Sequence, residues 1–574
     1  MEAAASKEVV APWMAAPYIN KWLEECRRNH WACYRSIAGD IEGLEASAAT
    51  TWPTRLLRIS DSNKVGVPLV SLVETGGAHI GDYITLSHCW GPPGKRPYCT
   101  KVGNKEQHYR SIPFDDLPLT FQDATMISYC MGISYLWIDS LCIVQDDKED
   151  WDKESMIMGE IYANAVLSFA AQSAHDSSEG LFKIRQPFQT AQLWFDPRKG
   201  ASVGSILVLD SAAFHQSFMY LEGSPLQKRG WVMQEYILSR RIVHFTSLGM
   251  VFTCYGEQAS KHGALSSDRF SRTEFGMGQV SRPIDTWIEL VQAYSARNLT
   301  YQSDKLAAVH GIASALARRN QTTYYHGLFL DYFPRHLAWF PCDSKAQRAT
   351  HPSIPSWSWA SMTGGIRMND SFKGVHLKDE VPRGWQCKNI CQLVKSGNGI
   401  HPGALELSGK PIPVRVLHGE HWCQFYGGFF FGIRDLLELH AVEIEEAWAK
   451  CRAQNQGFSQ PRSCNVRCVA KPKEQRKGNT RGIFIISGAE NDLAGWCSFD
   501  EGIPVLDVLH FLPIYQFESV CSHRWVRSQG KHRWWCLLVK ATAGRPPTFY
   551  QRVGFGVLEE GQLLNRSFEQ VFLI

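Results

Sequence analysis

Residues 83–170 alternate between strand-like and helix-like segments, and this alternation constrains the fold more than any other feature of the chain. Residues 83–87 (YITLS), 134–139 (SYLWID) and 166–170 (VLSFA) are short apolar runs that predict buried strands. The segments between them show helical periodicity. Strands that alternate with helices in this order favour a parallel α/β sheet.

The sequence also marks the ends of the two helices between these strands. Thr120 and Asp123 have the spacing of an N-terminal capping box, and Gly132 is placed to end that helix. The acidic stretch 146–150 is expected to begin the second helix, because carboxylates stabilise the positive end of a helix dipole.

A chain of 574 residues is longer than one hydrophobic core usually supports, so we expect several domains. A helix at 229–239 and a strand at 241–245 are expected to complete the α/β part. Farther along, the pattern changes to short β-type runs such as 482–487 and 534–540. We therefore predict a helical N-terminal segment, an α/β domain, a mainly helical region and a β-rich C-terminal region, at residues 1–60, 80–250, 251–345 and 346–574.

The charge of the chain gives no sign of a polyanionic partner. A formal net charge of +4 is nearly neutral for this length, so nothing global implies nucleic acid or an anionic membrane as partner. The basic stretch 462–481 has no interleaved aromatic residue for base stacking, which favours a solvated loop. We predict no nucleic-acid partner.

The sequence also bears on the compartment. Its first residues (MEAAASKEVV) lack a basic region followed by an apolar run, so no secretory signal is predicted. No apolar stretch approaches the roughly 20 residues needed to span a bilayer. The 17 cysteines are scattered and do not look like a secreted disulfide framework. These features predict a cytoplasmic protein without a membrane span.

Three blocks of the chain, in order, resemble the heterokaryon-incompatibility (HET) domain. They are residues 83–91 (YITLSHCWG), 136–145 (LWIDSLCIVQ) and 229–235 (RGWVMQE). The family usually has a tyrosine where His88 stands and an asparagine where Val144 stands. Segments outside the domain also resemble the corresponding segments of proteins in this family, among them residues 26–33, 52–57, 294–311 and 355–360.

The resemblance implies a biological role. Family members are known in filamentous fungi, where incompatible alleles that meet in fused cells cause death. We therefore expect an effector of growth arrest or programmed cell death in non-self recognition. The resemblance also implies a Rossmann-like fold distantly related to the TIR domain, self-association, and a protein partner from the incompatibility system.

Two polar residues follow strands of the predicted sheet. Ser87 and Asp139 stand at the carboxyl ends of what we expect to be neighbouring parallel strands, where ligands bind in open α/β sheets. With Trp90 of the first block, they are predicted to bind substrate. The alternative is that Asp139 caps the following turn and Ser87 hydrogen-bonds to the backbone.

Trp231 and Glu235 lie one helical turn apart and so share a face. NAD-cleaving TIR domains place a tryptophan and a catalytic glutamate at this spacing, so the resemblance implies that Glu235 is catalytic and Trp231 binds substrate. A carboxylate suits this chemistry, because breaking the ribose–nicotinamide bond builds positive charge on the sugar. NAD would then be the substrate, and no cofactor is predicted. Alternatively, Glu235 pairs with Arg229 or Arg240, and Trp231 fills the core.

Three soft ligands, Cys26, His30 and Cys33, share one face of the predicted N-terminal helix. A tetrahedral zinc site needs a fourth ligand, and none is evident nearby in the sequence. The same spacing is typical of a buried helical face. We therefore predict no metal site.

Other catalytic motifs find less support. Cys89 and Cys142, near His88, are candidate nucleophiles, but their apolar neighbours would raise the thiol pKa and lower reactivity. The chain has no GxxxxGK[ST] phosphate loop and no GxGxxG after the first strand, which argues against an NTPase and a standard dehydrogenase.

Two mechanisms stay open. In the first, the domain is an enzyme that depletes NAD, or makes a nucleotide-derived signal, through Glu235. In the second, it is a binding module that self-associates or recruits a partner, and death follows from assembly. The acidic and polar residues at strand ends favour the enzyme.

Overall fold

The structure is a computed structural model, and its described residues form two compact units. The N-terminal unit comprises residues 1–283 and 297–320, and the C-terminal unit comprises residues 284–296 and 321–574. Within these, the structure describes residues 11–30, 33, 51–62, 66–182, 190–195, 204–209, 224–247, 249–255, 283–333, 335–342, 346–349, 354–368, 387–389, 392–396, 404–409, 411–424, 480–487, 493–500, 509–518, 532–542, 549–559 and 569–574.

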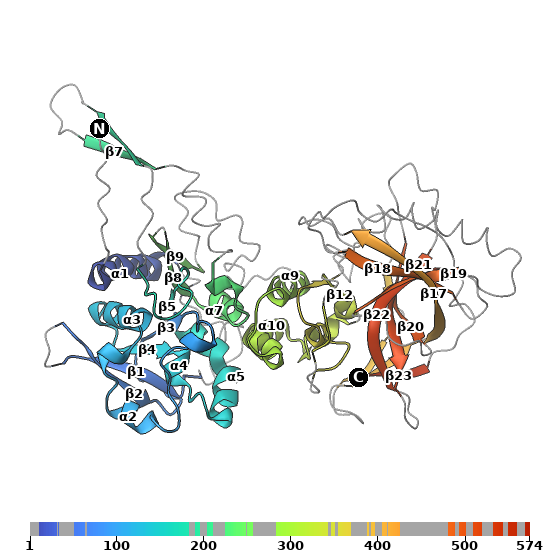
Figure 1. The fold of residues 1–574 in the computed structure, drawn as a ribbon, viewed down its shortest axis with the longest axis horizontal. Helices are drawn as coiled ribbons and strands as arrows, with labels where there is room; N and C mark the ends of the chain where they lie inside the picture. The colour runs from blue at the N-terminus through green and yellow to red at the C-terminus, as the bar shows by residue number, and fades with distance from the viewer. Residues whose placement is uncertain are drawn as a thin grey trace, which may run out of the picture. The chain divides into compact units, whose positions relative to one another are not determined.

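A seven-stranded sheet forms the centre of the N-terminal unit, in the order β2-β1-β4-β3-β5-β8-β9 (Figure 1). The central strands β4, β3, β5 and β8 are parallel, whereas the outer strands β1, β2 and β9 pair antiparallel. The prediction of a parallel α/β sheet is therefore confirmed for its centre. The strands are β1 (Arg55–Ser60), β2 (Leu69–Glu74), β3 (Tyr83–Ser87), β4 (Tyr135–Ile138), β5 (Leu167–Ala170), β8 (Arg241–Thr246) and β9 (Gly249–Cys254). A separate hairpin pairs β6 (Thr190–Phe195) with β7 (Gly204–Leu209).

Helices cover both faces of this sheet. The connection through α3 runs from β3 to β4, and the connection through α5 returns past β3 to β5, so right-handed crossovers place the two helices on opposite faces. On one face α1 packs against α3, and on the other α7 and α10 pack against α5 (Figure 1). The helices are α1 (Pro12–Asn29), α2 (Lys105–Arg110), α3 (Leu119–Cys130), α4 (Asp139–Cys142), α5 (Lys148–Asn164), α7 (Val232–Leu238) and α10 (His310–Asn320).

The predicted start of α5 is confirmed. Asp147 is its N-cap, and the carboxylate accepts hydrogen bonds from the backbone N–H groups of Glu149 and Asp150. The predicted end of α3 is also confirmed. Gly132 follows the last turn of α3 with a φ of +76°, as expected of a glycine that ends a helix.

The predicted capping box of α3 is wrong. The helix begins two residues earlier, with Pro118 and not Thr120 at the N-cap position, and no side chain caps it. Thr120 Oγ1 instead accepts from the N–H of Gly180 (3.2 Å), and Asp123 Oδ2 accepts from the N–H of Leu181 (2.8 Å). Both side chains therefore bind the loop that follows β5. These are tertiary contacts, which the local spacing of the residues does not reveal.

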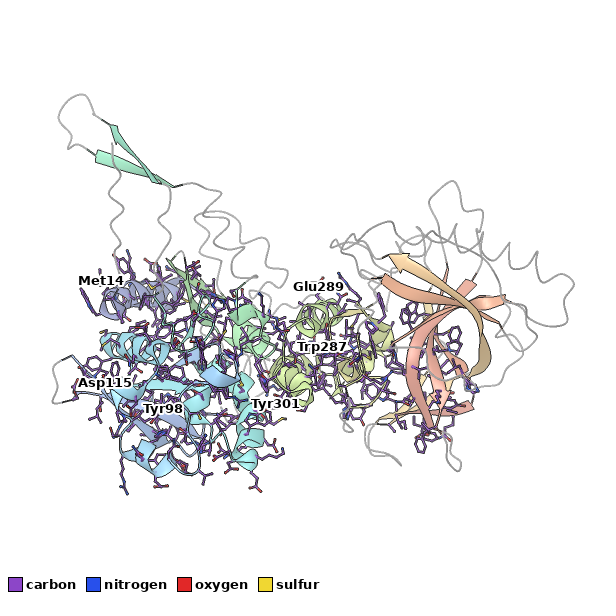
Figure 2. The ribbon with its side chains drawn as sticks, in the orientation of Figure 1. Met14, Tyr98, Asp115, Trp287, Glu289 and Tyr301 are labelled. Carbon is purple, nitrogen blue, oxygen red and sulfur yellow. The ribbon has the colours of Figure 1, made fainter. Side chains whose placement is uncertain are left out.

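In the C-terminal unit, α9 (Pro283–Ser295) packs against short strands. Trp287 of α9 is buried, and its indole N–H donates to the carbonyl of Gly327 at 3.1 Å (Figure 2). The predicted helical region thus contains α9 and α10, but from Tyr324 onward it also forms strands. These are β10 (Tyr324–Tyr325), β11 (Leu328–Phe329) and β12 (Trp339–Pro341), which pairs with β13 (Ile366–Met368).

The predicted β-rich C-terminal region is confirmed by a ten-stranded sheet. Because β21 pairs with both β20 and β22, these strands close into a ring of pairings with β17, β18 and β19. Residues 462–479 of the predicted basic loop lie outside the described residues. The strands are β14 (Cys387–Asn389), β15 (Gln392–Ser396), β16 (Leu405–Gly409), β17 (Ile412–Gln424), β18 (Thr480–Ser487), β19 (Leu493–Phe499), β20 (Leu509–Glu518), β21 (His532–Ala541), β22 (Phe549–Glu559) and β23 (Glu569–Leu573).

A buried arginine organises the core of this unit. Arg552 is fully buried, and it donates to the carboxylate of Asp500 through Nε (3.0 Å) and Nη2 (3.2 Å). Its guanidinium carbon lies 3.4 Å from the centre of the Trp339 ring, a stacked arrangement that also satisfies the cation. Arg348 Nη2 donates to the same carboxylate at 3.1 Å.

Among the described residues, no helix is both long and apolar enough to cross a membrane.

The helices behind the sheet approach closely at two glycines. A Cβ at Gly159 of α5 would lie 2.8 Å from the Cα of Gly311 and 2.9 Å from Cδ1 of Leu238. Beside this contact, Gln234 Oε1 of α7 accepts from the N–H of Gly311 at 2.7 Å. The position of α7 therefore depends on the absence of a side chain at Gly159.

We expect Gly159→Ala to destabilise the protein, although alanine is the better helix former by about 1 kcal/mol. The new methyl group would force α5 and α10 apart, an overpacking that costs about 1–3 kcal/mol. Differential scanning calorimetry should show a lower unfolding midpoint, by about 2–4 °C for each kcal/mol lost. Gly103→Ala is the matched control, because a Cβ there meets no atom within 4 Å. A Gly159→Ala protein as stable as the parent would contradict this packing.

Candidate functional site

The candidate site lies at the carboxyl ends of β3 and β4. The parallel register pairs Leu86 with Ile138, so the next residues, Ser87 and Asp139, come from adjacent strand ends, as predicted. The chain leaves β3 toward β4 on one side, whereas β5 on the other side of β3 leads toward β8. This reversal makes the edge near Ser87 a topological switch point, where ligands bind in open α/β sheets.

A glycine turn after β3 brings Trp90 to Asp139. Gly91 has a φ of +76°, and a Cβ there would lie 2.7 Å from the Cβ of Asp176, so the turn requires glycine. The indole N–H of Trp90 then donates to Asp139 Oδ2 at 2.8 Å. The other carboxylate oxygen of Asp139 accepts from the N–H of Ser140 at 2.7 Å. The Asp139 carboxylate therefore binds an N–H of the first turn of α4, in which Asp139 itself stands, and also holds Trp90.

Glu235 reaches the same site from α7. It is 4% exposed, and its carboxylate accepts a short hydrogen bond from the hydroxyl of Ser87. The start of α7 is fixed by Gly230, whose N–H donates to the carbonyl of Asn298 at 2.7 Å. A Cβ at Gly230 would lie 2.4 Å from Cδ2 of Leu299, which explains the glycine of the RGW block.

The surroundings of Glu235 favour its neutral form. Burial raises the pKa of Glu235 from 4.5 to about 7, while the charge of Arg229 and the hydroxyls of Ser87 and Tyr162 act in the opposite direction. The negative charge of Asp139 adds to the rise. Burial, with the charges of Glu235 and Asp139, also raises the pKa of Tyr162 well above its usual value. A carboxyl group with this pKa can give or accept a proton near neutral pH.

The described contacts do not pair Glu235 with the arginines of the alternative interpretation. Arg240 Nη2 donates to the carbonyl of Asn164 at 3.0 Å, away from Glu235. Arg229 Nη1 donates to the carbonyl of His88, and it influences Glu235 through its charge.

Trp231 stands one turn before Glu235, as the sequence predicts. The N–H of Glu235 bonds to the carbonyl of Trp231 at 3.3 Å. The indole of Trp231 is half-buried and packs edge-on against Trp151 of α5, with ring centres 6.2 Å apart. It therefore contributes to the edge of the core, and the substrate-binding role of this residue stays a prediction.

His88 belongs to the site, although the sequence singled it out only for its departure from the family and as a base for a cysteine. Its ring is buried, and Nδ1 lies 3.7 Å from Asp139 Oδ1. Neither ring nitrogen has a hydrogen-bond partner among the described residues. Burial lowers the pKa of His88 to about 4, so the ring is neutral at pH 7. A bound ligand could satisfy these nitrogens.

The two candidate nucleophiles are unreactive in this environment. Burial raises the pKa of Cys89 to about 11 and the pKa of Cys142 to about 12. Both are therefore thiols at neutral pH, and the thiolate is the form that attacks. The structure thus agrees with the interpretation of both as buried thiols.

Comparison with known proteins identifies one domain. Residues 83–235 match the family model described as "Heterokaryon incompatibility protein (HET)". The match begins at the first residue of β3 and ends at Glu235. No curated protein and no solved structure matches the chain.

The raised pKa of Glu235 predicts a pH-dependent stability. Between pH 4.5 and about 7 the folded protein holds a proton that the unfolded chain releases, so this contribution is complete below pH 4.5 and is lost as the pH rises to 7. Glu235→Gln removes this loss of stability, because glutamine does not titrate. As the pH rises from 4.5 to about 7, we expect the free energy of unfolding of the variant to increase relative to that of the parent, by at most about 3 kcal/mol. Above this window the difference should stay constant.

Urea unfolding of parent and variant at pH 4.5 and pH 8 measures this change. Glu106→Gln, at an exposed position of α2, is the control for the loss of one surface carboxylate. A Glu235→Gln difference that is independent of pH would show that the Glu235 carboxyl titrates normally.

Proposed function

The chain is a HET-domain protein, with that domain over residues 83–235, and we propose that it is a cell-death effector of non-self recognition that hydrolyses NAD. The observation that carries the enzymatic part is the buried carboxyl of Glu235, bound by Ser87 at the carboxyl end of a central parallel strand. Burying a carboxyl group is costly, and perturbed carboxyls of this kind cluster at active sites.

The reaction suits one carboxylate. The bond between ribose C1′ and the nicotinamide nitrogen breaks, and its electron pair leaves with the nitrogen, so positive charge develops on the ribose. Glu235, as the anion, would stabilise that charge more strongly in the transition state than in the ground state. Water then adds to C1′ and loses a proton, which a carboxylate with a pKa near 7 can accept.

The other groups of the site would position the substrate. Asp139 and Trp90 are partly exposed and hydrogen-bonded to each other, so together they offer a carboxylate for ribose hydroxyls and an indole face for a base. The buried ring of His88 stands behind Asp139, with Nδ1 3.7 Å from Oδ1, and so would support the position of that carboxylate. Trp231 stands at the start of α7, on the same face of that helix as Glu235.

Access to Glu235 sets a condition on activity. Because its side chain is 4% exposed, the reacting ribose can approach only after α7 or the Trp90 turn moves. Self-association offers a cause for such a movement, and we expect activity to rise with protein concentration.

We expect Glu235→Gln to reduce NAD hydrolysis by about 100- to 1000-fold, the usual effect of losing one preorganised electrostatic group. Nicotinamide release from the purified full-length protein, over a range of concentrations, measures this. Glu106→Gln should retain parental activity, since its side chain is exposed on α2. Toxicity on expression should follow the same order among the variants.

Two outcomes would overturn the enzymatic proposal. One is an absence of nicotinamide release from the parent at every concentration at which it assembles. The other is full toxicity of a folded Glu235→Gln protein.

The second candidate function is a non-enzymatic module that assembles or recruits a partner through this unit. The observation in its favour is that α1 carries two exposed aromatic side chains, Trp13 and Tyr18, each 63% exposed. Large exposed aromatic side chains are typical of contact surfaces between proteins. In this case, Glu235 and Ser87 serve to hold α7 on the sheet.

For the assembly function, we expect the double variant Trp13→Ser and Tyr18→Ser to lose self-association and toxicity together. Light scattering measures the assembly, and the nicotinamide assay should show no turnover in either parent or variant. A double variant at Lys148 and Asp152, an exposed ion pair on α5, is the control and should assemble normally. A toxic parent that stays monomeric at all concentrations would contradict this function.

A further inference from the structure

We propose that the N-terminal unit binds one structural zinc ion where α1 meets the edge strand β9. The four ligands are Cys26, His30, Cys33 and Cys254. This site is independent of the proposed chemistry at Glu235.

The ligand atoms are already gathered. One sulfur or nitrogen atom from each of the four side chains lies within 4.8 Å of every other. A tetrahedral zinc ion with Zn–S bonds of about 2.3 Å separates its ligand atoms by about 3.8 Å, so only small shifts are required. His30 Nδ1 and Cys254 Sγ are 3.1 Å apart.

Local structure supplies three of the ligands. Cys26 lies in the last turn of α1, and the N–H of His30 bonds to its carbonyl at 3.0 Å. The N–H of Cys33 in turn bonds to the carbonyl of His30 at 3.0 Å. The three side chains therefore converge on one side of the end of the helix.

The fourth ligand, which the sequence alone did not suggest, comes from far along the chain. Cys254 ends β9 and is 224 residues after His30. It pairs in register with Arg241 at the start of β8. The four ligands form a Cys₃His set, which is a set typical of closed structural zinc sites.

A buried cation lies beside the sulfur atoms. Arg241 is 3% exposed, and its Nε donates to Cys26 Sγ at 3.1 Å. The guanidinium also donates to the carbonyls of Cys33 (3.1 Å) and Val166 (3.3 Å). Three thiolates around Zn²⁺ carry a net charge of −1, which this guanidinium would balance while it orients a ligand from the outer shell.

Neutral thiols explain the cluster less well. The cysteines do pack with Tyr255 and Phe252 in a small buried apolar cluster. Apolar packing, however, does not explain why a histidine nitrogen contacts a sulfur atom. It also does not explain why a buried arginine donates a hydrogen bond to another sulfur atom. A metal-bound thiolate accounts for both. With four protein ligands, the ion would have no open position, so its role would be structural.

The test uses the purified full-length protein and its Cys254→Ser variant. Inductively coupled plasma mass spectrometry after gel filtration should find about one zinc per parent chain and at least about tenfold less in the variant. Cys142→Ser is the matched control, because Cys142 is equally buried but lies outside the cluster. This control should keep its zinc even if it is less stable.

A second measurement does not depend on the folding of a variant. Zinc is removed from the parent with a chelator and replaced with Co²⁺, whose absorption reports its ligands. We expect a thiolate-to-cobalt charge-transfer band, visible bands of a tetrahedral ion, and a higher thermal midpoint with metal than without. Parent protein that takes up neither zinc nor cobalt, or Cys254→Ser protein that retains parental zinc, would overturn the proposal. So would a disulfide between two of the three cysteines in protein purified without oxidant.

Discussion

The hydrogen bond from Ser87 to the buried carboxyl of Glu235 joins the central strand of the sheet to α7, and the candidate site is built around it. A carboxyl group at 4% exposure loses most of its hydration, which costs several kcal/mol unless neighbouring groups compensate. The hydroxyls of Ser87 and Tyr162 and the charge of Arg229 offset part of this cost. The remainder appears as a pKa of about 7, so the site holds a proton that is easily exchanged at neutral pH.

Three separate contacts hold α7, which carries this carboxyl, in the position that the structure shows. At its start, Gly230 is bound to Asn298. In its middle, Gln234 bonds to Gly311, where two glycines allow α5 and α10 to approach closely. At its end, the hydroxyl of Ser239 donates to the carbonyl of Glu235 (2.6 Å). The same hydroxyl also forms a hydrogen bond with the hydroxyl of Ser168 in β5 (2.7 Å). The glycines of the RGW block and of α5 are thus explained by packing around one acid.

The sequence predicts the parts of the fold that depend on local pattern. The strands around Ser87 and Asp139 follow from apolar runs, and the start of α5 follows from its acidic cap. It fails where a side chain serves a distant segment: Thr120 and Asp123 have the spacing of a helix cap but bind the loop after β5. For the same reason, the contact of Ser87 with Glu235, 148 residues away, could be suggested only through family resemblance. Cys254 beside His30 could not be found at all, since no motif links ligands so far apart.

The proposed metal site and the candidate active site share one stretch of chain. Only Ser239 and Arg240 separate the end of α7 from β8, and β8 begins with Arg241, which binds Cys26 and the carbonyl of Cys33. A metal at this cluster would fix Arg241. It would thereby also fix the connection between β8 and α7, the helix that carries Glu235. The end of α1 would then be tied to the same point through Cys26. Glu235 would therefore be held from two directions, by Ser87 on the central strand and by the anchored start of β8.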